Sequence, residues 1–315
     1  MRSFLRRKAW RRVLAIALGL LVAVLLVEVG LRVYALTIHP SVGQLVHEVD
    51  RNVDFLIVCA GDSHTEGKGA PRGFDYPSQL AALLDHIDPA RRYAVVNLGL
   101  AGCNSSEAAN RALEFMRRSP RAPDLVIFEA GKNNDHNFKD ARIFPELAAS
   151  RDYREWARYL LSNSRAFRLS QITYRRLEEL SHNPNPTLRL DADHFFAVDG
   201  AAEQALLVRW MIADLAVLRD ATLKRGGKLV LLNYFLEAPW VDQAYRDFVR
   251  RSPTALVDIH RFGLGALARM ADWSGLIKYP DYHPNARGYA RIAQLIYRQL
   301  AEQRLLPEKK NAATQ

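Results

Sequence analysis

Three residue types in this chain can together carry out nucleophilic catalysis. Ser63 follows an apolar run and the pair Gly61-Asp62, while His283 and Asp281 lie close together near the other end. A serine hydroxyl becomes a strong nucleophile when a histidine accepts its proton and an acid orients that histidine. The reaction expected of such a set is attack on the carbonyl carbon of an ester. The elements around these residues decide whether they can meet.

The element that carries Ser63 is predicted from residues 55–60, which are apolar and rich in branched and aromatic side chains. Such a run is typical of a strand buried on both faces of a parallel sheet. Gly61-Asp62-Ser63 then stands at the carboxyl end of the strand, where open α/β sheets bind ligands. A turn into a helix here exposes the hydroxyl and places the Ser63 N–H near the positive end of that helix. We interpret His64 as a residue of the first helical turn rather than as the base.

A phosphate-binding loop is the alternative for this stretch. The motif G-x-x-x-x-G-K-[ST] has four residues between its glycines, whereas Gly61 and Gly67 enclose five. Lys68 is followed by Gly69, so the hydroxyl that would bind magnesium is missing. The spacing therefore excludes a phosphate loop and leaves the nucleophile interpretation.

The rest of the chain alternates between buried strands and amphipathic helices. Strands are predicted at 55–60, 93–98, 124–130, 228–235 and 255–259, and helices at 76–87, 105–118, 201–225 and 285–305. This alternation predicts an α/β fold, a three-layer α/β/α sandwich around a mostly parallel five-stranded sheet.

The N-terminal segment reads as a membrane anchor. Residues 1–12 carry six cations and no acid, and residues 13–36 are almost entirely apolar. A helix over residues 10–34 would be roughly 36 Å long, enough to cross the hydrocarbon core. Glu28 and Arg32 are four apart and can pair on one helix face. The pattern predicts a cytoplasmic basic flank at 1–12, a transmembrane signal-anchor at 13–36, and the remaining chain outside the cytoplasm.

A cleaved signal peptide is the alternative, with Val33-Tyr34-Ala35 as the cleavage site. The length of the apolar run and the charged pair before that site favour retention of the segment. A buried helix of a soluble protein is disfavoured by the cationic flank.

The remaining sequence predicts one large domain. Residues 37–54 read as a polar tether, 55–306 as the domain, and 307–315 as a disordered tail. A helical, arginine-rich insertion over about residues 136–199 interrupts the strand–helix rhythm. Because it follows a strand end, it is either a lid or substrate wall, or a solvated helix without a role at the site.

The charge distribution and the cysteine content limit which partners, metal sites and disulfides the sequence predicts. Six of the ten net positive charges lie in the N-terminal flank, which leaves too little elsewhere to indicate nucleic-acid binding. The two cysteines, Cys59 and Cys103, lack metal-ligand spacing. Since each adjoins a loop assigned to the site, they form either a disulfide or two separate buried thiols.

Four short blocks, in order, resemble those of the GDSL/SGNH hydrolases over about residues 55–305. The blocks are GDSHTEG at 61–67, Gly99 with Gly102, Gly131-Lys132-Asn133, and DYHPN at 281–285. Asn134 stands where the family usually has Asp. The resemblance implies the flavodoxin-like SGNH fold.

The resemblance also assigns roles to particular residues. It implies that Ser63 is the nucleophile and His283 the base, and that the oxyanion is bound by the backbone N–H groups of Ser63 and Gly102 and by the Asn133 side chain. Loss of one such donor typically lowers turnover by roughly 10²–10³-fold. Supporting positions of the motifs are Gly61, Asp62, Gly99 and Gly131. Lys132 either contacts an anionic substrate or is solvated.

The acid of the triad departs from the family pattern. The usual position, three residues before the histidine, is Pro280, and Asp281 is only two before His283. In an extended backbone, residues two apart project to the same side, and Pro284 favours that backbone at His283. We therefore assign the role to Asp281, with Asp258 or a backbone carbonyl as alternatives.

Taken together, these features predict a membrane-anchored serine esterase that uses neither a metal nor an organic cofactor. Its predicted location indicates an acylated small molecule, lipid or glycan of the cell envelope as substrate, such as an O-acetylated glycan. Two alternatives remain: an acyltransferase on the same scaffold, and a catalytically inactive binding or assembly protein.

Overall fold

A computed structural model describes most of the chain in two compact units. The described residues are 2–38, 41–49, 52–135, 137–142, 161, 164–167, 169–170, 173, 201–236, 238–259, 275–278 and 283–308. One unit comprises residues 1–41 and 152–193, and the other comprises residues 42–151 and 194–315.

The larger unit is built on a five-stranded sheet in which all neighbouring strands are parallel. In sheet order the strands are β2 (Tyr93–Asn97), β1 (Phe55–Gly61), β3 (Leu125–Glu129), β4 (Lys228–Leu232) and β5 (Ala255–Val257). The predicted fold class is confirmed. Because β2 and β3 lie on opposite sides of β1, the strand order reverses beside β1, which is where such sheets bind ligands.

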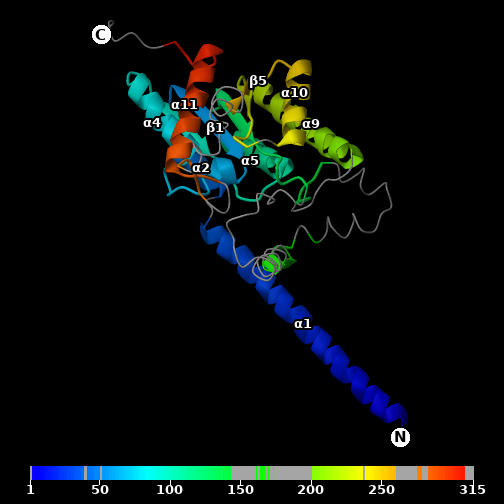
Figure 1. The fold of residues 1–315 in the computed structure, drawn as a ribbon. Coiled ribbons are helices and arrows are strands. Elements are labelled where there is room, and N and C mark those ends of the chain that lie inside the picture. Colours follow the sequence, from blue (N-terminus) through cyan, green and yellow to red (C-terminus); the bar gives the residue numbers. More distant parts are fainter. Residues whose placement is uncertain are drawn as a thin grey trace. The chain divides into compact units, whose positions relative to one another are not determined.

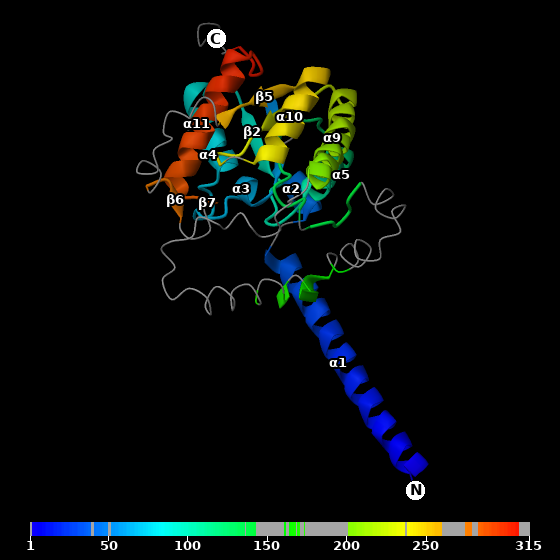
Figure 2. The ribbon, with the colours of Figure 1, turned by 45° about the vertical axis from the view of Figure 1, so that its right-hand side comes forward.

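Two hydrophobic cores cover the two faces of this sheet. Side chains alternate along β1, so Leu56 and Val58 enter one core while Ile57 and Cys59 enter the other. The first core is closed by α2 (Val42–Glu48), α5 (Ser105–Arg118), α9 (Ala201–Lys224) and α10 (Pro239–Arg251). The second core is closed by α4 (Tyr76–Ile87) and α11 (Ala286–Glu302). Figures 1 and 2 show these helices on the two sides of the strands.

Two helices of this unit differ from the sequence prediction. The stretch expected to be a polar tether contains α2, whose Val42 and Val46 are buried in the first core. Their spacing of four residues places them on one helix face, and that pattern is too short to have been recognised. Helix α10 was not predicted at all, although Val241, Tyr245 and Phe248 form its buried face.

The smaller unit contains α1 (Arg2–Ile38), a helix of 37 residues. Its segment Trp10–Ala35 is long and apolar enough to cross a membrane, with a mean hydropathy of 2.7. The predicted pair forms, because Arg32 Nε donates to Glu28 Oε1 at 2.8 Å. Within the same unit, Glu28 Oε2 also accepts from the Ala166 N–H at 2.9 Å. Most of the predicted insertion at 136–199 lies outside the described residues.

Candidate active site

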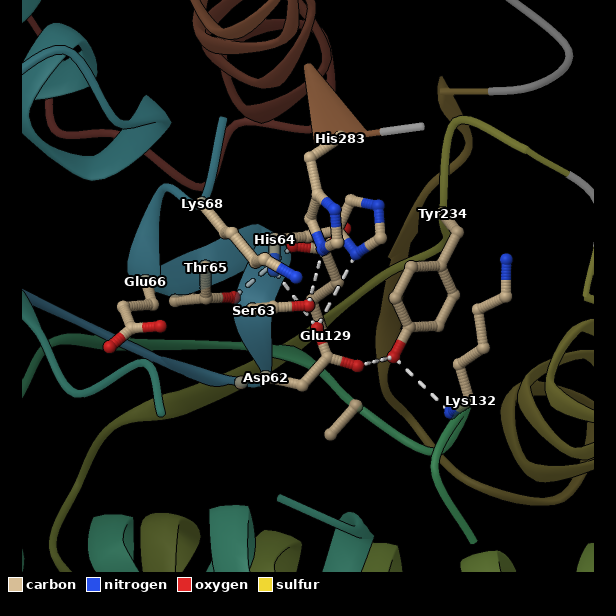
Figure 3. Close-up of polar contacts among 12 residues, drawn as sticks. Asp62, Ser63, His64, Thr65, Glu66, Lys68, Glu129, Lys132, Tyr234 and His283 are labelled. Atoms are coloured by element: carbon tan, nitrogen blue, oxygen red, sulfur yellow. Dashed lines mark hydrogen bonds and ion pairs between the residues drawn. The ribbon is translucent and has the colours of Figure 1, made fainter. Parts of the chain in front are cut away.

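Ser63 and His283 are in hydrogen-bond contact. Ser63 begins α3 (Ser63–Glu66), directly beyond β1, and His283 begins β7 (His283–Pro284), which pairs antiparallel with β6 (Ile277–Lys278). The distance from His283 Nε2 to Ser63 Oγ is 2.7 Å (Figure 3). Gly69 allows the close approach of β7, since a Cβ at this position would lie only 2.9 Å from His283 Cβ. The fold thus joins the two residues that the sequence assigned as nucleophile and base.

Asp62 lies under this pair as a buried carboxylate. It caps the N-terminus of α3, where its Oδ1 accepts from the His64 N–H at 3.0 Å. Its Oδ2 accepts a short hydrogen bond from the Tyr234 hydroxyl. Burial alone would raise the pKa of Asp62, but the hydrogen bonds from His64 and Tyr234 bring it below its usual value. The carboxylate is therefore ionised at neutral pH and fixes the turn that carries Ser63.

The ring of His64 is packed inside the site. It is 7% exposed, and its centroid is 4.8 Å from that of His283, with the two planes inclined by 28°. Tyr234 and Phe235, which follow β4, contact the same ring at centroid distances of 5.1 and 5.4 Å. His64 is a first-turn residue of α3, as predicted, and its buried ring also lines the site beside His283.

Gly99 and Gly102 lie in the loop between β2 and α5. This loop is tied to β1 by the Leu100 N–H, which donates to the Gly61 carbonyl at 3.0 Å. Gly102 has a φ of +72°, and a Cβ there would meet open space. Glycine is thus needed for the left-handed backbone rather than for lack of room. Asn137 holds the loop from the other side, because its Nδ2 donates to the Gly102 carbonyl at 2.8 Å.

Asn133 and Asn134 lie in the turn that begins with Gly131 after β3. Asn133 Nδ2 donates to the Cys103 carbonyl at 2.9 Å and is 3.5 Å from Asp62 Oδ2. Asn134 is fully buried, and its Oδ1 accepts from the Ser105 N–H at 2.9 Å. The residue that replaces the usual Asp of the motif therefore holds the start of α5 beside the Gly102 loop.

Two residues at the site were missed from the sequence. Tyr234 binds Asp62 across 172 positions of the chain, and its hydroxyl also accepts from the Lys132 N–H at 3.3 Å. Its place two residues beyond a buried strand was the only signal. Asn137 had no signal, since its role depends on a contact with a distant loop.

Three further residues that the sequence analysis considered for the site are Lys132, Asp281 and Asp258. Lys132 is half-buried, and in Figure 3 its side chain lies on the far side of Tyr234 from Ser63. Asp281 lies outside the described residues. Asp258, the alternative acid, has its Oδ1 bound to Asn233 Nδ2 at 2.8 Å.

Both cysteines are buried free thiols in the structure. Cys59 lies in β1 and Cys103 in the Gly102 loop, where its Sγ is 3.3 Å from the Gly61 carbonyl oxygen. Burial raises the pKa of each thiol. Of the two arrangements expected from the sequence, the structure has the separate thiols.

The model of the GDSL-like lipase/acylhydrolase family matches residues 59–291, which include Ser63, Gly102, Asn133 and His283. The chain belongs to this family. Membership of the GDSL-like family supports hydrolase activity on acylated substrates. A comparison with curated protein sequences finds no significant match.

Several solved structures are similar to this chain at low identity. TesA is 17% identical over 80% of this chain and 99% of its own, with a TM-score of 0.47. A lipase/acylhydrolase from Enterococcus faecalis is 13% identical over 82% of this chain and 100% of its own, with a TM-score of 0.47. A two-domain esterase active on acetylated mannans is 16% identical over 82% of this chain and 54% of its own, with a TM-score of 0.46.

Proposed function

We propose that this GDSL-like acylhydrolase is a membrane-anchored serine esterase that acts through an acyl-enzyme on Ser63. The observation that carries the proposal is the 2.7 Å contact between Ser63 Oγ and His283 Nε2 at the carboxyl end of β1. In the proposed reaction His283 accepts the Ser63 proton as the oxygen attacks the ester carbonyl. It then returns the proton to the leaving alcohol. Water, or an acceptor alcohol in the transferase alternative, completes the cycle.

The oxyanion would be bound by the N–H groups of Ser63 and Gly102 and by the Asn133 amide. Asn133 Nδ2 has two hydrogens, and the Cys103 carbonyl at 2.9 Å accepts one of them. The other faces Asp62 across 3.5 Å, a weak contact that a substrate oxygen can replace. The donor is thus held in position before substrate arrives, which is what electrostatic stabilisation of a transition state requires.

Fluorophosphonate labelling tests the nucleophile. The wild-type protein should be labelled and should hydrolyse short acyl esters, and Ser63→Ala should lose both properties while keeping its circular dichroism spectrum. Ser105→Ala is the matched control, because this serine is buried in α5 and bound to Asp214 at 2.6 Å. Normal turnover in folded Ser63→Ala would overturn the proposal.

For the triad acid we propose Asp281. The comparison is between Asp281→Asn and Asp258→Asn, measured as kcat on one ester. Loss of the acid in serine triads lowers kcat by about 10⁴-fold. We expect that loss for Asp281→Asn and a small effect for Asp258→Asn, whose carboxylate is bound to Asn233. The reverse order would assign the role to Asp258.

We further propose that Trp10–Ala35 remains in the membrane, with the basic flank in the cytoplasm and the catalytic domain outside. The substrate would then be an acylated lipid or glycan of the envelope. A reporter active only outside the cytoplasm, fused after Gln315, should be active in the membrane fraction. Recovery of a soluble protein beginning near Leu36 would instead identify a cleaved signal peptide.

A further inference from the structure

His64 is held in place independently of His283. Its backbone N–H donates to Asp62 Oδ1 at 3.0 Å, and its Nδ1 is 3.5 Å from the same oxygen. The Tyr234 ring meets it edge-on at an angle of 72°, and the Phe235 ring is inclined to it by 59°. The imidazole is thereby fixed by the turn of α3 and by the residues after β4.

The remaining face of His64 is covered by His283. The two rings are stacked, with centroids 4.8 Å apart (Figure 3). His283 comes from a two-residue strand outside the main sheet, and the His64 ring packs flat against its imidazole. The fixed His64 ring thus gives His283 a surface to pack on, and in this orientation His283 Nε2 lies 2.7 Å from Ser63 Oγ.

We propose that His64 is a positioning residue that orients His283 by stacking, an inference that rests on the proposed esterase function. The stacked ring keeps His283 Nε2 directed at Ser63 Oγ while the proton is transferred.

The experiment compares His64→Ala with His64→Phe. The alanine variant removes the stacking surface, whereas phenylalanine keeps a flat ring. Since a displacement of about 1 Å costs up to about 100-fold in rate, His64→Ala should lower kcat by about tenfold to 100-fold with a nearly unchanged KM. His64→Phe should recover most of this loss. His86→Ala, an exposed histidine of α4, is the matched control.

The split between kcat and KM and the rescue by phenylalanine are readouts that a purely structural role would not produce. Equal kcat of His64→Ala and wild type would overturn the positioning role. Equal loss in both variants would overturn stacking.

Thermal unfolding of each variant confirms that it is folded. The proposed function fails separately, because a wild-type protein without fluorophosphonate labelling or turnover would overturn the esterase itself. An active wild type with an unaffected His64→Ala would overturn only the role of His64.

Discussion

At the scale of single residues, Asp62 and Tyr234 form a buried hydrogen bond to a charged group at the site. Both side chains are almost fully buried, and the hydroxyl donates to a carboxylate that has to remain ionised. Removing one partner of a buried charge leaves that charge without compensation, which costs more than the hydrogen bond contributed. The contact is therefore expected to matter for both stability and activity.

The first prediction concerns Tyr234→Phe. The loss of a hydrogen bond to a charged group should lower the free energy of unfolding by about 1.5–3 kcal/mol. Because Asp62 fixes the turn of Ser63, kcat/KM should also fall by about tenfold to 100-fold. Urea unfolding and ester hydrolysis measure the two effects.

A second tyrosine–aspartate pair supplies the control for this prediction. Tyr93, at the amino end of β2, donates to Asp88 Oδ2 at 3.1 Å, and Asp88 caps the C-terminus of α4. Ser63 lies beyond the opposite, carboxyl end of the parallel strand β1. Tyr93→Phe should lose about 1 kcal/mol of stability with kcat/KM unchanged. If both variants lose activity equally, Tyr234 has no special role at the site.

The site could be predicted from sequence to the extent that its residues fall in short local patterns. Such blocks contain Ser63, Gly102, Asn133 and His283, and the structure brings their loops together at the carboxyl end of β1. Tyr234 could not be found in this way, because its role depends on a partner 172 residues away with no pattern of its own.

At the scale of elements, the sheet was easier to predict than the helices. Its central strands are buried on both faces, so their sequences are continuous apolar runs bounded by polar residues. The misses were α2 and α10. Helix α2 has only 7 residues, and periodicity over so few residues does not distinguish a helix from a loop. Helix α10 has 13 residues, and its buried Val241, Tyr245 and Phe248 do follow a helical spacing, so this helix was open to prediction from the sequence and was overlooked.

Glu129, the last residue of β3, makes the stability of the fold depend on pH. Glu129 is buried, and its Oε2 is 3.1 Å from Thr65 Oγ1 in α3. Burial, together with the charge of Asp62, raises the pKa of Glu129 well above its usual value of 4.5. The folded protein therefore holds a proton that the unfolded chain releases. Stability is fully present below the unfolded pKa and is lost as pH rises toward the folded one.

The second prediction is that Glu129→Gln removes the loss of stability that the wild-type protein shows as pH rises. Glutamine resembles the protonated carboxyl group and can still bind Thr65. Above about pH 5, the variant should gain stability relative to wild type by about 1.4 kcal/mol per pH unit until the folded pKa is reached. Urea unfolding from pH 5 to 8 measures the difference. Parallel curves for the two proteins would show that Glu129 is ionised in the folded state.

At the scale of the whole molecule, the boundary between the two units falls before α2. Val42 and Val46 are buried in the first core of the larger unit, together with residues of α5. This helix therefore belongs to the catalytic domain, although the sequence suggested that residues 37–54 were only a tether.

The third prediction compares two truncated proteins. A chain beginning at Thr37 lacks the predicted anchor but keeps α2, and it should be soluble and labelled at Ser63. A chain beginning at Asn52 also loses the two buried valines, so its free energy of unfolding should be lower by on the order of 3 kcal/mol. Equal unfolding midpoints would show that α2 adds nothing to the domain.

The small sheet β6–β7 has a consequence for how the enzyme loses activity on heating. It is separate from the main sheet and consists of two residue pairs, with further bonds from Asn285 to the Leu276 and Gly275 carbonyls at 2.8 and 2.9 Å. Among the described residues the pairing spans only two positions on each strand, and such short pairings open locally at a lower free energy than the whole domain unfolds. Inactivation should therefore begin at a temperature where far-ultraviolet circular dichroism is still native, and it should reverse on cooling. The His283 amide should exchange with deuterium earlier than the amides of β1, and coincident inactivation and unfolding curves would mean that the histidine leaves Ser63 only when the sheet itself melts.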